Sequence, residues 1–133
     1  MAIPMHGQGR NGDVPVILVV DDEEPVVGLL TDVLEDQGYT VIAAHNGRVA
    51  LQLAQERHPD LVISDVMMPF VDGIELTRRL RAGNGTRDIP VILMSAAMSP
   101  DLVACGANDF VGKPFAIDRI DNLVARYVGA GRP

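Results

Sequence analysis

Hydrophobic positions along the chain fall into five short runs that are separated by longer amphipathic segments. Most of the runs are continuous rather than alternating, which is typical of parallel strands covered on both faces. We therefore expect strands at Val16–Val20, Thr40–Ala44, Leu61–Ser64, Val91–Met94 and Asp109–Gly112.

The segments between the runs have the apolar spacing of helices that bury one face. Glu24–Gln37 is predicted to be helical, with Pro25 in its first turn and Gly38 just past its end. Three further helices are expected over Asn46–Arg57 with Asn46 as the N-cap, after the N-cap Asp72, and over Ala116–Val128. In the second of the four helices, the predicted inward face consists of Val49, Ala50, Leu53 and Ala54.

Strands that alternate with helices predict an α/β fold, a doubly wound and flavodoxin-like five-stranded parallel sheet. The 133 residues suit one domain, which we place at residues 14–129. Residues 1–13 are rich in glycine and polar side chains and are expected to form a flexible tail, and residues 130–133 a short C-terminal tail.

The interval between the fourth and fifth strands leaves room for little more than one helical turn. Ser99 and Pro100 can start a helix, but Gly106 must end it, so the helix is confined to about Asp101–Cys105. A helix this short is marginal without packing support, and we expect the face that it builds to be shortened or partly disordered.

Composition and charge exclude several classes of protein. The net charge of −7 argues against a surface that binds nucleic acid and favours binding of a cation or a basic partner. The single Cys105 leaves no disulfide framework and no cysteine-based metal site, which suits a reducing, cytoplasmic location. No apolar run approaches the roughly 18 residues that span a bilayer, and residues 1–13 lack the apolar stretch of a signal peptide.

Chemically useful side chains follow the predicted strands, at the edge where open α/β sheets place their sites. Asp21 and Asp22 follow the first strand, Asp65 the third, Ser95 the fourth and Lys113 the fifth. Crowded carboxylates repel one another, and a divalent cation such as Mg²⁺, which prefers oxygen ligands, relieves that repulsion. A carboxylate can also attack phosphorus, and an ammonium group can offset the charge of a phosphoryl group.

Four sequence motifs at these strand ends, in this order, resemble the receiver domains of two-component response regulators. The resemblance covers about Val14 to Val128. The motifs are Val19-Val20-Asp21-Asp22-Glu23, Ser64-Asp65-Val66-Met67-Met68-Pro69 followed by Asp72-Gly73, Leu93-Met94-Ser95-Ala96, and Gly112-Lys113-Pro114-Phe115. One such motif alone is weak, whereas four at strand ends are specific.

The resemblance implies a role for each matching position. Asp65 is the expected phosphoacceptor, and Ser95 and Lys113 are expected to contact the phosphoryl group. Mg²⁺ or Mn²⁺ is expected on Asp21, Asp22, Asp65 and the backbone carbonyl of Met67. Phe110 occupies the place of an aromatic rotamer switch but lacks the hydroxyl that many relatives carry, and the Lys113–Pro114 bond is expected to be cis.

The same resemblance implies partners. A sensor histidine kinase or phosphotransfer protein would donate the phosphoryl group, and a downstream protein would read the response, without nucleic-acid or membrane contact. We expect no turnover of an external substrate.

Simpler interpretations stand beside these roles. The acidic run after the first strand could be a charged helix N-terminus, Ser95 could serve a turn, and Phe110 could fill the core. The remaining candidates are expected to be structural: Met67 and Met68 as packing residues, Cys105 as a buried filler, and His6, His45 and His58 as surface residues without ligand spacing.

Other functions remain open beside the phosphorylation switch. An aspartyl-phosphate phosphatase commonly needs a second Asp two residues after the nucleophile, where this chain has Met67. A module that keeps the fold without being phosphorylated, or a receiver belonging to a larger regulator with an output domain, fits the same motifs. A flavin or NAD domain is disfavoured because no glycine-rich nucleotide loop is present.

Overall fold

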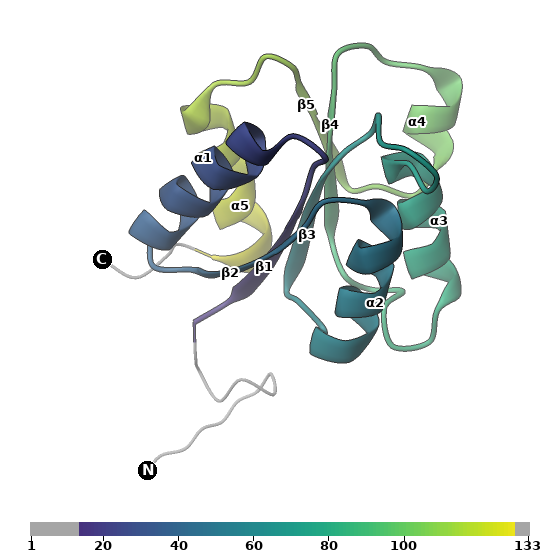
Figure 1. The fold of residues 1–133 in the computed structure, drawn as a ribbon, viewed down its shortest axis with the longest axis horizontal. Helices are drawn as coiled ribbons and strands as arrows, with labels where there is room; N and C mark the ends of the chain where they lie inside the picture. Colours follow the sequence, from purple (N-terminus) through teal and green to yellow (C-terminus); the bar gives the residue numbers. More distant parts are fainter. Residues whose placement is uncertain (1–13, 130–133) are drawn as a thin grey trace.

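Five parallel strands form a single sheet in the order β2-β1-β3-β4-β5, with helices on both faces (Figure 1). The structure is a computed structural model and describes residues 14–129. Its strands are β1 (Val16–Val20), β2 (Thr40–Ala44), β3 (Leu61–Asp65), β4 (Val91–Ser95) and β5 (Asp109–Gly112). Its helices are α1 (Glu24–Asp36), α2 (Gly47–Arg57), α3 (Gly73–Ala82), α4 (Pro100–Ala104) and α5 (Ile117–Val128). The predicted α/β fold and its five strands are therefore confirmed.

The sheet divides the core into two clusters, because successive side chains of a strand point to opposite faces. In β1, Leu18 and Val20 pack into the cluster under α2, α3 and α4, whereas Ile17 and Val19 pack into the cluster under α1 and α5. Figure 1 shows the same division of the helices between the two faces. Burial on both faces explains why the strand sequences are continuously apolar.

Side-chain caps fix the starts of three helices. Asn46 accepts a hydrogen bond from the backbone N–H of Val49 at 2.8 Å, and Asp72 accepts one from Glu75 at 2.8 Å. Ser99 caps the short α4 in the same way through the N–H of Leu102 at 3.1 Å. Each cap satisfies a backbone donor that the helix itself leaves unpaired.

Helix α4 is as short as the sequence predicts, with five residues, and the chain turns at Gly106, whose φ is +101°. Leu102 and Cys105 are buried beneath it, which supplies the packing that so short a helix needs. Cys105 is thus the buried filler that we expect.

The prediction that Val49 and Met67 pack inward is wrong for both residues. Val49 is 40% exposed, because Ala50 and Ala54 take the inward face of α2 and the adjacent position points about 100° away. Met67 is 78% exposed, since it lies in the loop after β3 and Met68, at 8% exposure, takes the inward position.

Several predictions fall outside the described residues, namely the two tails at 1–13 and 130–133 and the surface position of His6. Within the described part of the chain, no helix combines the length and the apolar character that crossing a membrane requires.

Candidate functional site

Parallel pairing brings the carboxyl ends of the strands to one edge of the sheet. Val20 pairs with Ser64, and Asp65 pairs with Met94, so that the residues after β1 and at the end of β3 are neighbours. Lys113 is held beside the end of β4 by a hydrogen bond from its N–H to the carbonyl of Ser95 at 2.9 Å. The candidate residues are therefore brought together by strand register.

Three carboxylates converge at this edge. Asp21, Asp22 and Asp65 each place one carboxylate oxygen within 4.8 Å of the others, the only such group of potential metal ligands among residues 14–129. Asp21 is fully buried and Asp65 is 6% exposed, whereas Asp22 is open to solvent. The N–H of Glu23 donates to Asp21 Oδ1 at 2.9 Å and orients this carboxylate. The oxygen-only donor set, with an open side, fits Mg²⁺ or Mn²⁺.

Lys113 lies between the two buried carboxylates. Its Nζ is 3.0 Å from Asp21 Oδ2 and 3.1 Å from Asp65 Oδ1. Burial lowers the pKa of Lys113, but the hydrogen bonds and charges of Asp21 and Asp65 outweigh burial, so this pKa lies above its ordinary value. The side chain is therefore a fixed cation at the site.

Burial and charge also set the ionisation of Asp65. Burial raises the pKa of Asp65, the hydrogen bond from Lys113 lowers it, and the charge of Asp21 raises it again. On balance the pKa of Asp65 lies above its ordinary value, so keeping this carboxylate ionised costs free energy. Such a carboxylate, next to a fixed cation and a cluster of oxygen ligands, can act as a nucleophile toward an electrophile of high negative charge.

The structure does not draw every predicted residue into this cluster. Ser95 lies at the end of β4, where its hydroxyl donates to the carbonyl of Ala97 and accepts from the N–H of Ala97 at 3.2 Å. Phe110 is partly buried on β5 and packs against the cluster beneath α4. Met67 follows Asp65 by two positions in an exposed loop, and the Lys113–Pro114 bond is cis, as expected.

Two features of this edge were not foreseen in the sequence. A Cβ on Gly47 would lie 2.2 Å from the carbonyl oxygen of Val71, so the first turn of α2 packs directly on the loop between β3 and α3. Phe70, in the same loop, is 96% exposed at a φ of +66°. The sequence offers one signal, an aromatic residue directly after Pro69 in a loop that ends at Asp72-Gly73.

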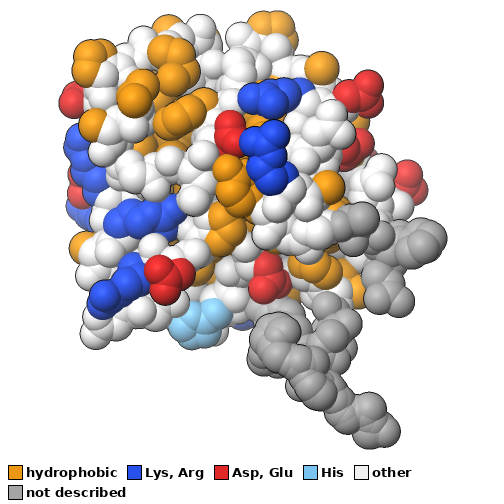
Figure 2. All heavy atoms as spheres, turned by 180° about the vertical axis from the view of Figure 1, so that it is seen from behind, with side chains coloured by type: hydrophobic (Ala, Val, Ile, Leu, Met, Phe, Trp, Pro, Cys, Tyr) orange, Lys and Arg blue, Asp and Glu red, His pale blue; other side chains and the backbone are white. Residues whose placement is uncertain are grey.

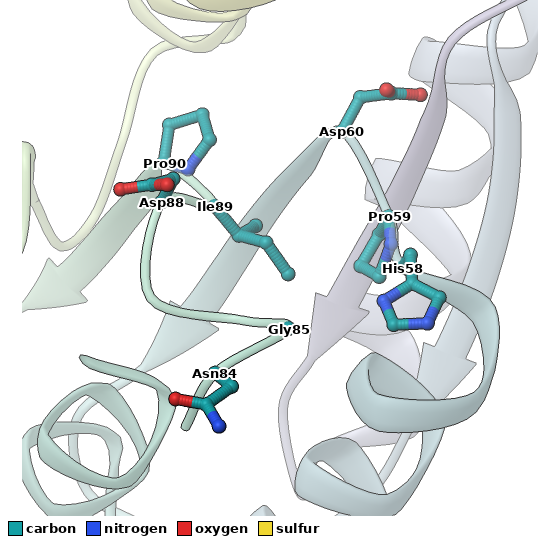
Figure 3. Close-up of a pocket in the computed structure, with 8 residues that line it drawn as sticks. All are labelled: His58, Pro59, Asp60, Asn84, Gly85, Asp88, Ile89 and Pro90. Carbon is teal, nitrogen blue, oxygen red and sulfur yellow. The ribbon is translucent and has the colours of Figure 1, made fainter. Parts of the chain in front are cut away.

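A separate hollow of about 290 Å³ lies at the opposite edge of the sheet (Figure 3). Its charged side chains do not converge, since the carboxylates of Asp60 and Asp88 point away from each other. Asp60 accepts a hydrogen bond from the N–H of Val16 at 2.7 Å, and the exposed His58 packs against Gly85. Our candidate site is accordingly the acidic edge.

The histidines of the described chain are surface residues, as predicted. Both His45 and His58 are exposed. His45 Nε2 contacts Glu24 Oε1 at 2.6 Å, where the β2–α2 connection meets the start of α1. Neither joins the group of potential metal ligands.

The chain matches a known family of domains and is similar to several characterised proteins. The sequence model of the response regulator receiver domain matches residues 17–125. The chain is 35% identical over 117 residues to the polar-differentiation response regulator DivK of Brucella suis, covering 85% of this chain and 95% of DivK. It is 41% identical over 114 residues to the regulatory protein AtoC of Escherichia coli, covering 83% of this chain but 24% of AtoC.

Solved structures show the same fold. The chemotaxis protein CheY4 of Vibrio cholerae superimposes with a TM-score of 0.81 at 30% identity, covering 86% of this chain and 99% of that one. The receiver domain of a Pseudomonas aeruginosa sensor histidine kinase, which has a magnesium ion coordinated in its active site cleft, also gives 0.81, at 28% identity. That match covers 88% of this chain and 99% of the other.

Proposed function

Because the chain belongs to the response regulator receiver domain family, we propose that it is a phosphorylation-dependent switch that accepts a phosphoryl group on Asp65. One observation carries the proposal. Carboxylates from three separate positions lie within 4.8 Å of one another, and Lys113 lies 3.0 and 3.1 Å from the two buried ones. A group of this kind is costly to assemble unless it serves a ligand.

Asp21, Asp22, Asp65 and the backbone carbonyl of Met67 would hold Mg²⁺ or Mn²⁺. Such an ion supplies positive charge that screens the repulsion between a carboxylate nucleophile and an anionic phosphoryl group. The oxygen ligands of the chain support this assignment, and the magnesium-bound Pseudomonas receiver is a related precedent.

The remaining residues act on the phosphoryl group and its consequences. A carboxylate oxygen of Asp65 attacks phosphorus, and the bond from phosphorus to the donor breaks. Lys113 offsets the charge that arrives. Ser95 exchanges its contacts with Ala97 for a phosphoryl oxygen, which moves the β4–α4 loop, and Phe110 changes its packing beneath α4. The added charge of about −1.5 to −2 biases this two-state element.

The phosphoryl donor is a sensor histidine kinase or a phosphotransfer protein, and a downstream protein reads the altered face. We place the chain in the cytoplasm, without direct nucleic-acid or membrane contact, and with the receiver domain at residues 14–129 between tails at 1–13 and 130–133. External substrates are not turned over. The exposed Met67 offers no proton-transferring group at the position where a phosphatase of this chemistry needs one.

The test is labelling by a small phosphodonor. The unaltered chain with Mg²⁺ and acetyl phosphate is expected to gain one phosphoryl group by intact-mass spectrometry, and removal of Mg²⁺ with EDTA is expected to prevent the gain. Asp65→Asn is expected to abolish labelling. Asp88→Asn, which removes an exposed carboxylate at the opposite edge, is the matched control and is expected to be labelled normally.

Persistent labelling of Asp65→Asn would place the acceptor elsewhere. An unaltered chain that is not labelled, and whose NMR spectrum does not respond to Mg²⁺ with beryllofluoride, would be a fold-only interaction module instead.

A further inference from the structure

Phe70 is an unusual residue for its position. Its ring is 96% exposed, and its backbone adopts a φ of +66°, a left-handed conformation that bulky residues rarely take. Neither feature helps the chain to fold. An exposed aromatic ring gains no free energy from burial, and the left-handed backbone conformation of a bulky residue is strained. Strained and exposed residues of this kind point to a contact that the isolated chain does not make.

The loop that carries Phe70 is fixed at both ends. The N–H of Gly73 donates to the carbonyl of Val66 at 2.9 Å and closes the loop at its base. Met68 and Val71 are 8% and 7% exposed, and Val71 packs directly on Gly47 at the start of α2. Phe70 is therefore presented outward between two buried anchors, so little entropy remains to be lost when a partner binds.

A cavity of about 460 Å³ adjoins the ring and is lined by Asn46, Arg48, Val49 and Phe70. Val49 is 40% exposed, although the sequence places it on the buried face of α2. Arg48 is exposed and makes no ion pair with any residue of the 14–129 range. This surface therefore combines an exposed aromatic ring, an exposed aliphatic side chain and a cation that has no ion-pair partner within residues 14–129.

We propose that this surface, formed by Phe70, Val49 and Arg48, is a docking contact for the protein that donates the phosphoryl group to Asp65. The proposal rests on the proposed function. It implies a donor that packs an apolar side chain against Phe70 and Val49 and places an acidic group beside Arg48.

The identity of the partner follows from the short distance between Phe70 and Asp65. Phe70 is five positions after Asp65, so their Cα atoms are separated by at most about 18 Å, and the closed loop holds them closer. A stable interface buries about 800 Å² on each partner, a disc with a radius of about 16 Å. A protein whose interface of this size is centred near Asp65 therefore also reaches the loop that carries Phe70, whereas a small phosphodonor does not.

A second apolar surface serves as a control. Figure 2 shows hydrophobic side chains gathered on the α4 side of the molecule. Met98, just before α4, is 58% exposed, and Val103, within α4, is 61% exposed. No positive φ occurs at either residue. Truncation of Val103 therefore removes exposed apolar area of a similar kind without touching the loop after Asp65.

The test compares two phosphodonors on the same variants. One probe is acetyl phosphate, and the other is the histidine kinase that, within a panel of purified autophosphorylated kinases, transfers fastest to the unaltered chain. For Phe70→Ala we expect an unchanged rate with acetyl phosphate and a kcat/KM with the kinase that is lower by about tenfold or more, mainly through KM. Val49→Ser is expected to act in the same direction, Phe70→Leu less strongly, and Val103→Ala not at all.

The following outcomes would contradict the proposed docking contact. Equal rates from the kinase for Phe70→Ala and the unaltered chain would remove the role of the ring, and an equal loss with both donors would assign Phe70 to the chemistry of the site. Labelling of the unaltered chain by acetyl phosphate but by no kinase would also contradict it. A concentration-dependent dimer that Phe70→Ala dissociates would make a second copy the occupant. If acetyl phosphate did not label the unaltered chain, that result would instead contradict the proposed function.

Discussion

At Asp65, burial and the neighbouring charges compete, and their balance predicts how the metal-free chain responds to a substitution. Because the pKa of this carboxyl lies above its ordinary value of 3.8 in the folded chain, ionisation costs folding free energy at neutral pH. We expect Asp65→Asn to raise the free energy of unfolding at pH 7 without Mg²⁺, because the variant has no carboxyl group to ionise at this buried position. Lys113 keeps its partner in the variant, since Asp21 lies 3.0 Å away.

The sign of this effect can be checked with pH and metal. A raised carboxyl pKa means that the cost appears as pH rises through 3.8 and is absent below it, so the advantage of Asp65→Asn should shrink as the pH is lowered toward 3.8. Saturating Mg²⁺ should also reduce the difference in the free energy of unfolding between Asp65→Asn and the unaltered chain, because the variant has lost a proposed ligand of the metal ion. Urea denaturation at pH 7 and pH 5, with EDTA or Mg²⁺, measures both. A variant that is less stable than the unaltered chain in EDTA at pH 7 would contradict the argument.

At the scale of helices, two glycines with opposite surroundings give a matched pair of predictions. Gly47→Ala would place a Cβ 2.2 Å from the carbonyl oxygen of Val71, so the loop carrying Phe70 must move, and we expect a loss of about 1–3 kcal/mol. Gly28→Ala meets no atom within 4 Å in the interior of α1 and should stabilise by about 0.5–1 kcal/mol. Thermal unfolding of both variants tests the pair, and a stabilised Gly47→Ala would show that the loop yields easily.

Arg81 ties together the segments around the short α4. Its Nε donates to the carbonyl of Gly106 at 2.9 Å, and its Nη1 donates to Ile89 at 2.7 Å. Its Nη2 donates to Asn108 Oδ1 at 2.7 Å, so one guanidinium links the end of α3 to the α3–β4 connection and to the α4–β5 connection. This fork supplies a fixed geometry that a lysine cannot reproduce.

We therefore expect Arg81→Lys to cost about 1–3 kcal/mol and to speed amide exchange in residues 100–108 more than in the central strands. Hydrogen exchange by mass spectrometry measures this difference. Arg79→Lys is the control, because Arg79 pairs with Glu75 on the exposed face of α3 and, among residues 14–129, makes no side-chain hydrogen bond or ion pair to another segment. Uniform acceleration across the sheet would mean that Arg81 contributes to global stability without a special role at α4.

The features of the molecule that could be predicted from the sequence are mainly those that depend on local sequence patterns. The strands, the caps Asn46 and Asp72, and the short α4 each depend on neighbours in sequence, and the structure confirms them. The convergence of Asp21, Asp22 and Asp65 followed from parallel strand order. The contacts of Arg81 depend instead on partners that the fold brings from other segments, which no local period encodes. The exposure of Val49 and Met67 depends on which of two neighbouring residues meets the core, and that place goes to Ala50 and to Met68.

Over the whole molecule, the net charge of −7 makes the binding of any cation favourable, so a Mg²⁺ response must be separated from general screening. A bound ion stabilises the folded chain by about 2.7 kcal/mol when its free concentration is one hundred times its Kd. We expect Mg²⁺ to raise the Tm well beyond NaCl of equal ionic strength. Asp22→Asn should remove most of that excess, because Asp22 supplies the exposed member of the carboxylate cluster.

Asp32→Asn makes the same change of net charge at an exposed position on α1, outside the carboxylate cluster, and should leave the Mg²⁺-specific excess in place. The comparison of these two variants by differential scanning fluorimetry, across a Mg²⁺ titration at constant ionic strength, therefore separates a specific site from diffuse attraction. Equal losses in the two variants would mean that the chain responds to Mg²⁺ through its overall charge, and the carboxylates at the sheet edge would then have to be explained without a metal.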